Sequence, residues 1–139
     1  MQRLINERGM QGRITVDSAG TSSFHIGEPA DKRMQSAADL RGYALTSRSR
    51  QATGRDYSRF DLIIAMDRNN YRELATLFGE PTHKLRLFSE FLDADAPRDV
   101  PDPYHGEADG FATVLDMLER ACPKILDELI AIDNQKSRG

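Results

Sequence analysis

The sequence has 139 residues, of which 39% are hydrophobic, and this length corresponds to one compact domain. Its 19 Lys and Arg against 22 Asp and Glu give a net charge of -3, and the basic residues are scattered, so no nucleic-acid partner is predicted. The longest apolar run, residues 62–66, is too short to cross a membrane, and the first residues lead into no signal peptide. We therefore expect a cytoplasmic protein with no membrane partner.

The first third of the chain predicts two helices and a short strand. Residues 1–9 are typical of the last turns of a helix that ends at Gly9, and no capping residue precedes them, so we expect the chain to begin in mid-element. Residues 14–16 predict a short strand, followed by a loop rich in small and hydroxyl residues. A second helix is predicted with Pro29 in its first turn, helical spacing from Met34 onward and an end at Gly42.

The middle of the chain alternates between strand and helix patterns. Residues 60–66 are apolar on both alternating faces after the first two residues, which indicates a central parallel strand covered by helices on both sides. A helix over residues 71–78 follows, capped by Asp67 or Asn69, and residues 84–88 predict a more exposed strand. This alternation favours an α/β domain with a parallel sheet.

A proline-rich loop and a long helix complete the chain. Residues 94–110 predict a long loop, a kind of segment that is often functional. The last helix is predicted from about Phe111 to Ile130, with one apolar stripe. We expect one domain over residues 1–132 and a flexible tail over residues 133–139.

Three segments, in this order, resemble the low-molecular-weight protein-tyrosine phosphatases. They are residues 16–21 (Val-Asp-Ser-Ala-Gly-Thr), residues 60–67 (Phe-Asp-Leu-Ile-Ile-Ala-Met-Asp) and residues 100–104 (Val-Pro-Asp-Pro-Tyr) before a long helix. The likeness covers residues 3–129. It implies a doubly wound parallel sheet whose first strand ends in a phosphate-binding loop made of a cysteine, five residues, an arginine and a serine. That strand and loop are missing from this sequence.

The resemblance also implies a chemistry for which this chain lacks two groups. The family hydrolyses phosphotyrosine proteins or small aryl phosphates by thiolate attack at phosphorus, and an arginine and backbone N–H groups hold the phosphoryl oxygens. The single cysteine here, Cys122, lies on the apolar stripe of the last helix beside Pro123, and we interpret it as an inert core residue. Cys122 excludes an intrachain disulfide. We expect no catalytic turnover from these 139 residues.

Several residues match the family's remaining site positions. Asp102, followed by Pro103, corresponds to the general acid that protonates the leaving oxygen, and the proline stiffens its loop. Three residues correspond to substrate-binding positions: Phe24, Tyr104 and His105. Ser18 and Ser47 correspond to positions that support the phosphate-binding loop.

No metal or other cofactor is predicted. His25, His83 and His105 are not spaced as ligands on one element, and the acidic residues between 93 and 102 lack the glycine and terminal glutamate of a calcium loop. Residues 20–23 lack the glycine spacing and the lysine of a nucleotide loop.

Three functional interpretations stay open from the sequence, beside a non-functional fragment. In the first, a phosphatase carries the strand and loop before Met1. In the second, a shortened, inactive relative acts as a binding or regulatory module. In the third, the chain is an arsenate reductase of related fold, which would need further redox cysteines. The oligomeric state is not predicted.

Overall fold

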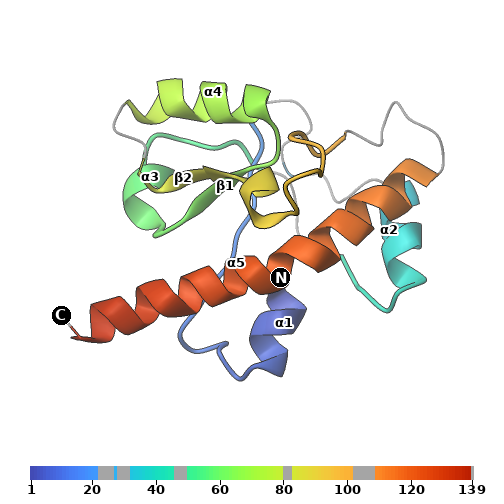
Figure 1. Cartoon of the computed structure of the whole chain (residues 1–139), viewed down its shortest axis with the longest axis horizontal. Coiled ribbons are helices and arrows are strands. Elements are labelled where there is room, and N and C mark those ends of the chain that lie inside the picture. Colours follow the sequence, from blue (N-terminus) through green and yellow to red (C-terminus); the bar gives the residue numbers. More distant parts are fainter. Residues whose placement is uncertain (22–26, 28–31, 46–49, 80–82, 102–108, 139) are drawn as a thin grey trace.

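The computed structural model describes residues 1–21, 27, 32–45, 50–79, 83–101 and 109–138. Figure 1 shows two short strands with α4 on one side and the long helix α5 on the other, while α1 and α2 lie against α5. The described elements in chain order are α1 (Gln2–Glu7), α2 (Lys32–Asp39), α3 (Asp56–Arg59), β1 (Ile63–Ala65), α4 (Arg68–Phe78), β2 (Leu85–Leu87), the 3-10 helix η1 (Phe88–Phe91) and α5 (Asp109–Arg138).

The two strands run parallel and are covered on both faces. Ile63 of β1 pairs with Leu85 of β2, and α4 connects the two strands. Ala65 packs against Leu74 of α4, whereas Ile64, one position earlier, packs into the cluster on α5. The strand predicted to be apolar on both faces is therefore confirmed. The chain has the predicted α/β fold, with helices on both sides of a parallel sheet.

The ends of the first, second and fourth helices lie where the sequence predicts them. Gly9 and Gly79 follow α1 and α4 with φ of 67° and 66°, a region in which a residue with a Cβ atom is strained. Asp67 caps α4, because its side chain accepts a hydrogen bond of 2.6 Å from the Asn70 N–H. Gly42 ends the turn after α2 in the same way as Gly9 ends α1.

Helix α5 is longer than predicted. It begins at Asp109 and continues to Arg138, so the predicted end near Ile130 is wrong. Two ion pairs fix the added turns, one between Arg13 and Asp133 and one between Asp61 and Lys136. The sequence did not predict these turns, because they are polar and their partners, Arg13 and Asp61, are distant in sequence. The division into a domain over residues 1–132 and a flexible tail over residues 133–139 stays a prediction.

Residues 14–16 do not form the predicted strand. Ile14 is buried against Ile5 and Leu126, but Val16 is 44% exposed. A strand needs a paired neighbour, and within the described residues the only pairing near this segment is a parallel bridge between Gly20 and Gln51. The sequence also did not predict α3 and η1, which are each four residues long.

Most of the core lies between α5 and the rest of the chain. Phe88 and Leu126 are almost fully buried, and the predicted stripe of α5 faces inward. Over the part of the chain that the structure describes, no helix combines the length and the apolar character that a membrane span needs.

Candidate active site at the carboxyl end of β1

The predicted site residues fall mostly outside the described part of the chain. Ser18 lies within it. Five others lie outside it, and their roles stay predictions: Phe24, Ser47, Asp102, Tyr104 and His105. The site is therefore built from the described segments that lead into these residues.

The segment that carries Ser18 is exposed and is fixed by polar contacts. The Ser18 N–H donates to Asp17 Oδ1 at 2.8 Å. Two residues later, the Gly20 N–H donates to the Arg50 carbonyl at 2.8 Å, and the Gly20 carbonyl accepts from the Ala52 N–H at 2.8 Å. The loop is thus held on both sides of Ser18, and the Ser18 side chain lies at the surface.

Arg50 joins this loop to a buried carboxylate. Its Nε donates to Asp17 Oδ2 at 2.9 Å, and its two Nη atoms each donate to Asp56 at 3.1 Å. Asp56, at 5% exposure, also accepts the Thr53 N–H at 2.8 Å. Burial raises the pKa of Asp56, but the hydrogen bonds from Arg50 and Thr53 outweigh it, so the net pKa lies below the usual value.

A second arginine fixes the segment that leads to Asp102. The Asp99 carboxylate accepts the Arg68 N–H at 2.8 Å and two guanidinium bonds of 3.2 Å and 3.1 Å. These hydrogen bonds from Arg68 lower the pKa of Asp99. The Val100 N–H donates to the Met66 carbonyl at 2.9 Å. The backbone two residues before Asp102 is therefore attached where β1 ends and α4 begins.

The described parts of the three segments that carry the family resemblance meet at the edge of the sheet where β1 ends. Thr21 Oγ1 accepts a hydrogen bond of 3.4 Å from Asn70 Nδ2 in the first turn of α4, and Val100 bonds to Met66 as described above. In open α/β sheets, ligands bind beyond the carboxyl ends of the strands. The structure thus brings Ser18 and the segment leading to Asp102 to the edge where such a site is expected.

Sequence reasoning missed Arg50, Asp56, Arg68 and Asp99. The pairs Arg50 with Asp17 and Arg68 with Asp99 are 33 and 31 residues apart. No local spacing rule connects residues at such separations, so charge alone could not single them out.

Cys122 lies in the core, as predicted. It is 9% exposed on α5, and burial raises the pKa of its thiol. The sixth residue after it is Glu128, where a phosphate-binding loop would have arginine. Within the described ranges, no group of three or more His, Cys, Asp or Glu side chains could hold a metal ion.

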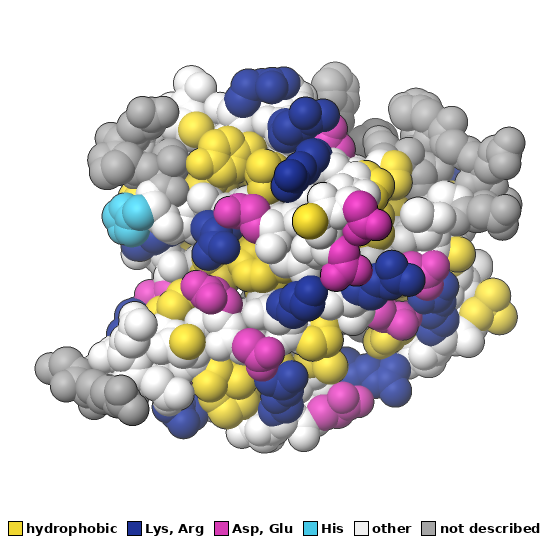
Figure 2. Space-filling model, in the orientation of Figure 1, with side chains coloured by type: hydrophobic (Ala, Val, Ile, Leu, Met, Phe, Trp, Pro, Cys, Tyr) yellow, Lys and Arg dark blue, Asp and Glu magenta, His cyan; other side chains and the backbone are white. Residues whose placement is uncertain are grey.

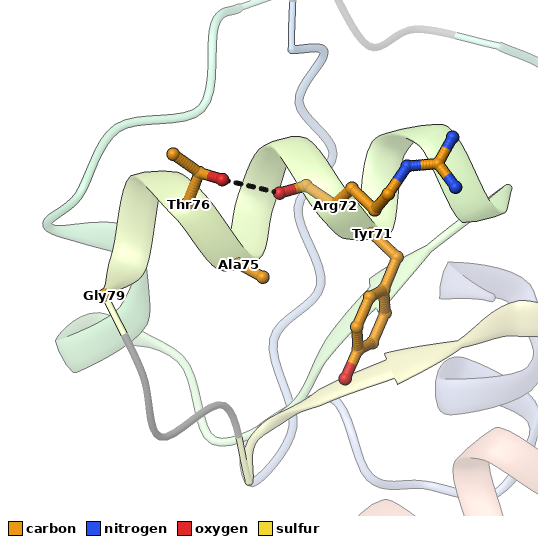
Figure 3. Close-up of a pocket in the computed structure, with 5 residues that line it drawn as sticks. All are labelled: Tyr71, Arg72, Ala75, Thr76 and Gly79. Carbon is orange, nitrogen blue, oxygen red and sulfur yellow. Dashed lines mark hydrogen bonds between the residues drawn. The ribbon is translucent and has the colours of Figure 1, made fainter.

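An open depression of about 520 Å³ lies along α4, between Tyr71 and Gly79. Figure 3 shows the Tyr71 side chain pointing toward the strands and Arg72 pointing away along the helix. The Thr76 hydroxyl donates to the Arg72 carbonyl at 3.1 Å, so it is already used within the helix. Polar groups do not converge there, and the depression is not a candidate active site. In Figure 2, basic and acidic side chains are interspersed over α5, and a small basic group lies over α4.

The parallel sheet with helices on both faces defines an α/β protein of the doubly wound class. Comparison with known proteins identifies the family. The family model "low molecular weight phosphotyrosine protein phosphatase" matches residues 1–136. The chain belongs to this family.

The relatives agree with this assignment. A Synechocystis protein, provisionally described as a low molecular weight protein-tyrosine-phosphatase, is 40% identical over 93% of this chain and 83% of its own. The human low molecular weight phosphotyrosine protein phosphatase is 32% identical over 91% of this chain and 82% of its own. A crystal structure of a protein tyrosine phosphatase from Entamoeba histolytica has a TM-score of 0.83 and 35% identity, over 99% of this chain and 86% of that chain.

Proposed function

We propose that the edge beyond β1 is a phosphomonoester site of the phosphotyrosine phosphatase type, in which Asp102 is the general acid. The substrate would be a phosphotyrosine protein, in line with the names of the relatives, or a small aryl phosphate that carries the same phenyl ester. Phe24, Tyr104 and His105 would contact the aryl group, and Ser18 and Ser47 would support a phosphate-binding loop. Family membership and the attachment of residues 99 and 100 to the end of β1 support this proposal.

The chemistry assigns one step to Asp102. When a thiolate attacks phosphorus, the bond from phosphorus to the phenolic oxygen breaks, and that oxygen needs a proton to leave as a neutral phenol. A carboxyl group held beside the oxygen donates this proton, and the resulting carboxylate then takes a proton from the water that hydrolyses the cysteinyl phosphate. Pro101 and Pro103 on either side restrict the backbone that would aim the Asp102 carboxyl.

We further propose that the 139 residues alone do not catalyse the hydrolysis of phosphomonoesters. One observation carries this proposal: the single thiol, Cys122, is buried in α5 and is followed by no arginine at the required spacing. Burial favours the neutral thiol, which is a poor nucleophile. Loss of both the nucleophile and the groups that hold the phosphoryl oxygens costs on the order of 10⁴ to 10⁶ in turnover.

The test is hydrolysis of an aryl phosphate by the purified 139-residue chain, beside Cys122→Ser and Asp102→Ala. All three proteins should release phenol at the rate of buffer alone. Turnover by the unchanged chain that Asp102→Ala abolishes would contradict the proposed inactivity while supporting the acid role. Turnover that Cys122→Ser abolishes would show that Cys122 is a nucleophile.

The alternative is a binding or regulatory module. Titration of a phosphotyrosine peptide into the same chain, monitored by calorimetry, separates the two functions. Saturable binding without turnover, lost when the peptide is dephosphorylated, would favour the module. An absence of both would count against both functions for the 139 residues alone.

A further inference from the structure

Arg50 is the centre of a polar chain that ends at the backbone of Ser18. Its guanidinium makes a two-pronged contact with Asp56 and a third hydrogen bond with Asp17, so all three of its nitrogens are used. The other oxygen of the Asp17 carboxylate accepts the Ser18 N–H at 2.8 Å. One unbroken series of contacts therefore runs from Asp56 through Arg50 and Asp17 to Ser18.

The two ends of this series differ in burial. The Asp56 side chain is 7% exposed and is also fixed by the Thr53 N–H, whereas the Asp17 side chain is 51% exposed. A paired, buried carboxylate is a rigid attachment point, because moving it would leave a buried charge without its partner. Arg50, at 33% exposure, transmits this fixed position to the exposed loop.

The backbone adds a second attachment beyond Ser18. The Gly20 N–H and carbonyl bond to the Arg50 carbonyl and the Ala52 N–H, which places the two segments side by side as a parallel bridge. Ser18 therefore lies between two attachments, and Arg50 takes part in both, through its side chain and through its carbonyl.

We propose that Arg50 is a positioning residue that holds the Ser18 loop at the carboxyl end of the sheet through Asp17. The purpose of that position, support of a phosphate-binding loop, rests on the function proposed above. Arginine is required for its geometry as well as its charge. A planar fork can contact Asp56 with two nitrogens while a third reaches Asp17, and a lysine ammonium cannot span both carboxylates in this way.

Amide NMR of the 139-residue chain tests this inference through three reporters: Ser18, Gly20 and Thr53. In Arg50→Gln, the Ser18 amide should shift and exchange with water roughly tenfold faster, as expected when the hydrogen bond to a fixed carboxylate is lost. Gly20 should follow, because its partner carbonyl belongs to the residue that has lost its anchor. In Arg50→Lys, amide exchange should be faster than in the unchanged chain but slower than in Arg50→Gln. The increase in exchange rate should be larger at Ser18 than at Thr53.

A second variant keeps the test decisive if Arg50→Gln does not fold. Asp17→Ala changes an exposed side chain and leaves the contact between Arg50 and Asp56 in place. It should reproduce the Ser18 change but leave the Thr53 amide as in the unchanged chain. In the double variant, Arg50→Gln should add little at Ser18, because both changes break the same series of contacts.

The matched control is Arg41→Gln. Arg41 has a similar side-chain exposure of 29% and also contacts two carboxylates, Asp116 and Glu119, but it joins the turn after α2 to α5. Its loss should leave the Ser18 and Gly20 amides unchanged. Unchanged Ser18 exchange in folded Arg50→Gln or in Asp17→Ala would overturn the inference. None of these signals depends on turnover, so a failure of the proposed function would be seen separately in the hydrolysis assay.

Discussion

Two regions of the molecule, the apolar side of the sheet that faces α5 and the polar carboxyl edge of the sheet, are stabilised in different ways. Beneath the sheet, α5 buries large apolar side chains, and Phe88 and Leu126 have exposures of 1% and 0%. At the carboxyl edge, exposed loops are attached by arginines, with Arg50 on one loop and Arg68 on the other. The apolar side supplies stability through burial, and the polar edge supplies position through directed bonds. The two regions should therefore respond differently to mutation.

The largest effect is expected at the polar edge when the missing chemistry is supplied. If a strand and a loop of the family, with its cysteine and arginine, are placed before Met1, hydrolysis of aryl phosphates should appear. Asp102→Ala in that protein should lower turnover by roughly 10² to 10⁴, the usual contribution of a positioned general acid. Steady-state kinetics with phenyl phosphates measures the loss.

The leaving group provides the control for this prediction. A phenol of low pKa needs little protonation to leave, so the loss caused by Asp102→Ala should shrink as the leaving-group pKa falls. Equal losses across the series would mean that Asp102 is not the acid.

A comparable effect on stability is expected on the apolar side. Leu126→Ala removes a fully buried side chain from the cluster formed with Ile5 and Ile14, and it should lower the free energy of unfolding by about 2 to 5 kcal/mol. Urea denaturation followed by circular dichroism measures the change. The matched control is Leu40→Ala, because Leu40 is 90% exposed, and its effect should stay within about 0.5 kcal/mol. Similar losses in both variants would show that the packing described here is wrong.

The difference between the apolar side and the polar edge also explains what could be predicted from sequence. The stripe of α5 and the two-faced strand β1 were predicted because burial imposes a period on nearby residues. The strand at residues 14–16 was predicted wrongly, because strand formation depends on a paired neighbour that composition does not reveal. Arg50 and Asp56 were missed because an ion pair leaves no repeating pattern. The role of Ser18 was predicted from the resemblance and stays a prediction, and the contacts that hold its loop were not predicted.

A smaller effect is expected for Asp56, and it should depend on pH. Asp56→Asn removes the charge from the two-pronged contact with Arg50 and should cost about 1 to 3 kcal/mol at neutral pH. This is less than for a fully buried pair, because Arg50 is partly exposed. The groups that face Asp56 are Arg50, the charge of Arg59 and the Thr53 N–H, and Asp17 shares Arg50.

The sign of the pH dependence follows from the lowered pKa. The folded pKa of Asp56 lies below its usual value of 3.8, so its contribution is complete above about pH 4 to 5 and is lost as the pH falls through the folded pKa. The stabilities of the unchanged chain and Asp56→Asn should therefore converge in acid, as measured by urea midpoints between pH 2.5 and 7. A difference that persists undiminished at pH 2.5 would exclude the charge as its origin.

The smallest effect on stability is expected for Asp99, although it holds the segment that leads to the predicted acid. The pair with Arg68 is solvent-exposed on both sides, at 61% and 44%, and exposed ion pairs contribute little because water and salt screen them. Asp99→Asn should therefore leave the midpoint of urea unfolding unchanged.

The same substitution weakens three hydrogen bonds that converge on one carboxylate, including the one from the Arg68 N–H. The Val100 amide, whose partner is the Met66 carbonyl, should then exchange faster, and 0.5 M NaCl should produce a similar change in the unchanged chain. A lowered unfolding midpoint together with an unchanged Val100 amide would mean that this pair stabilises the body of the protein and does not position its edge.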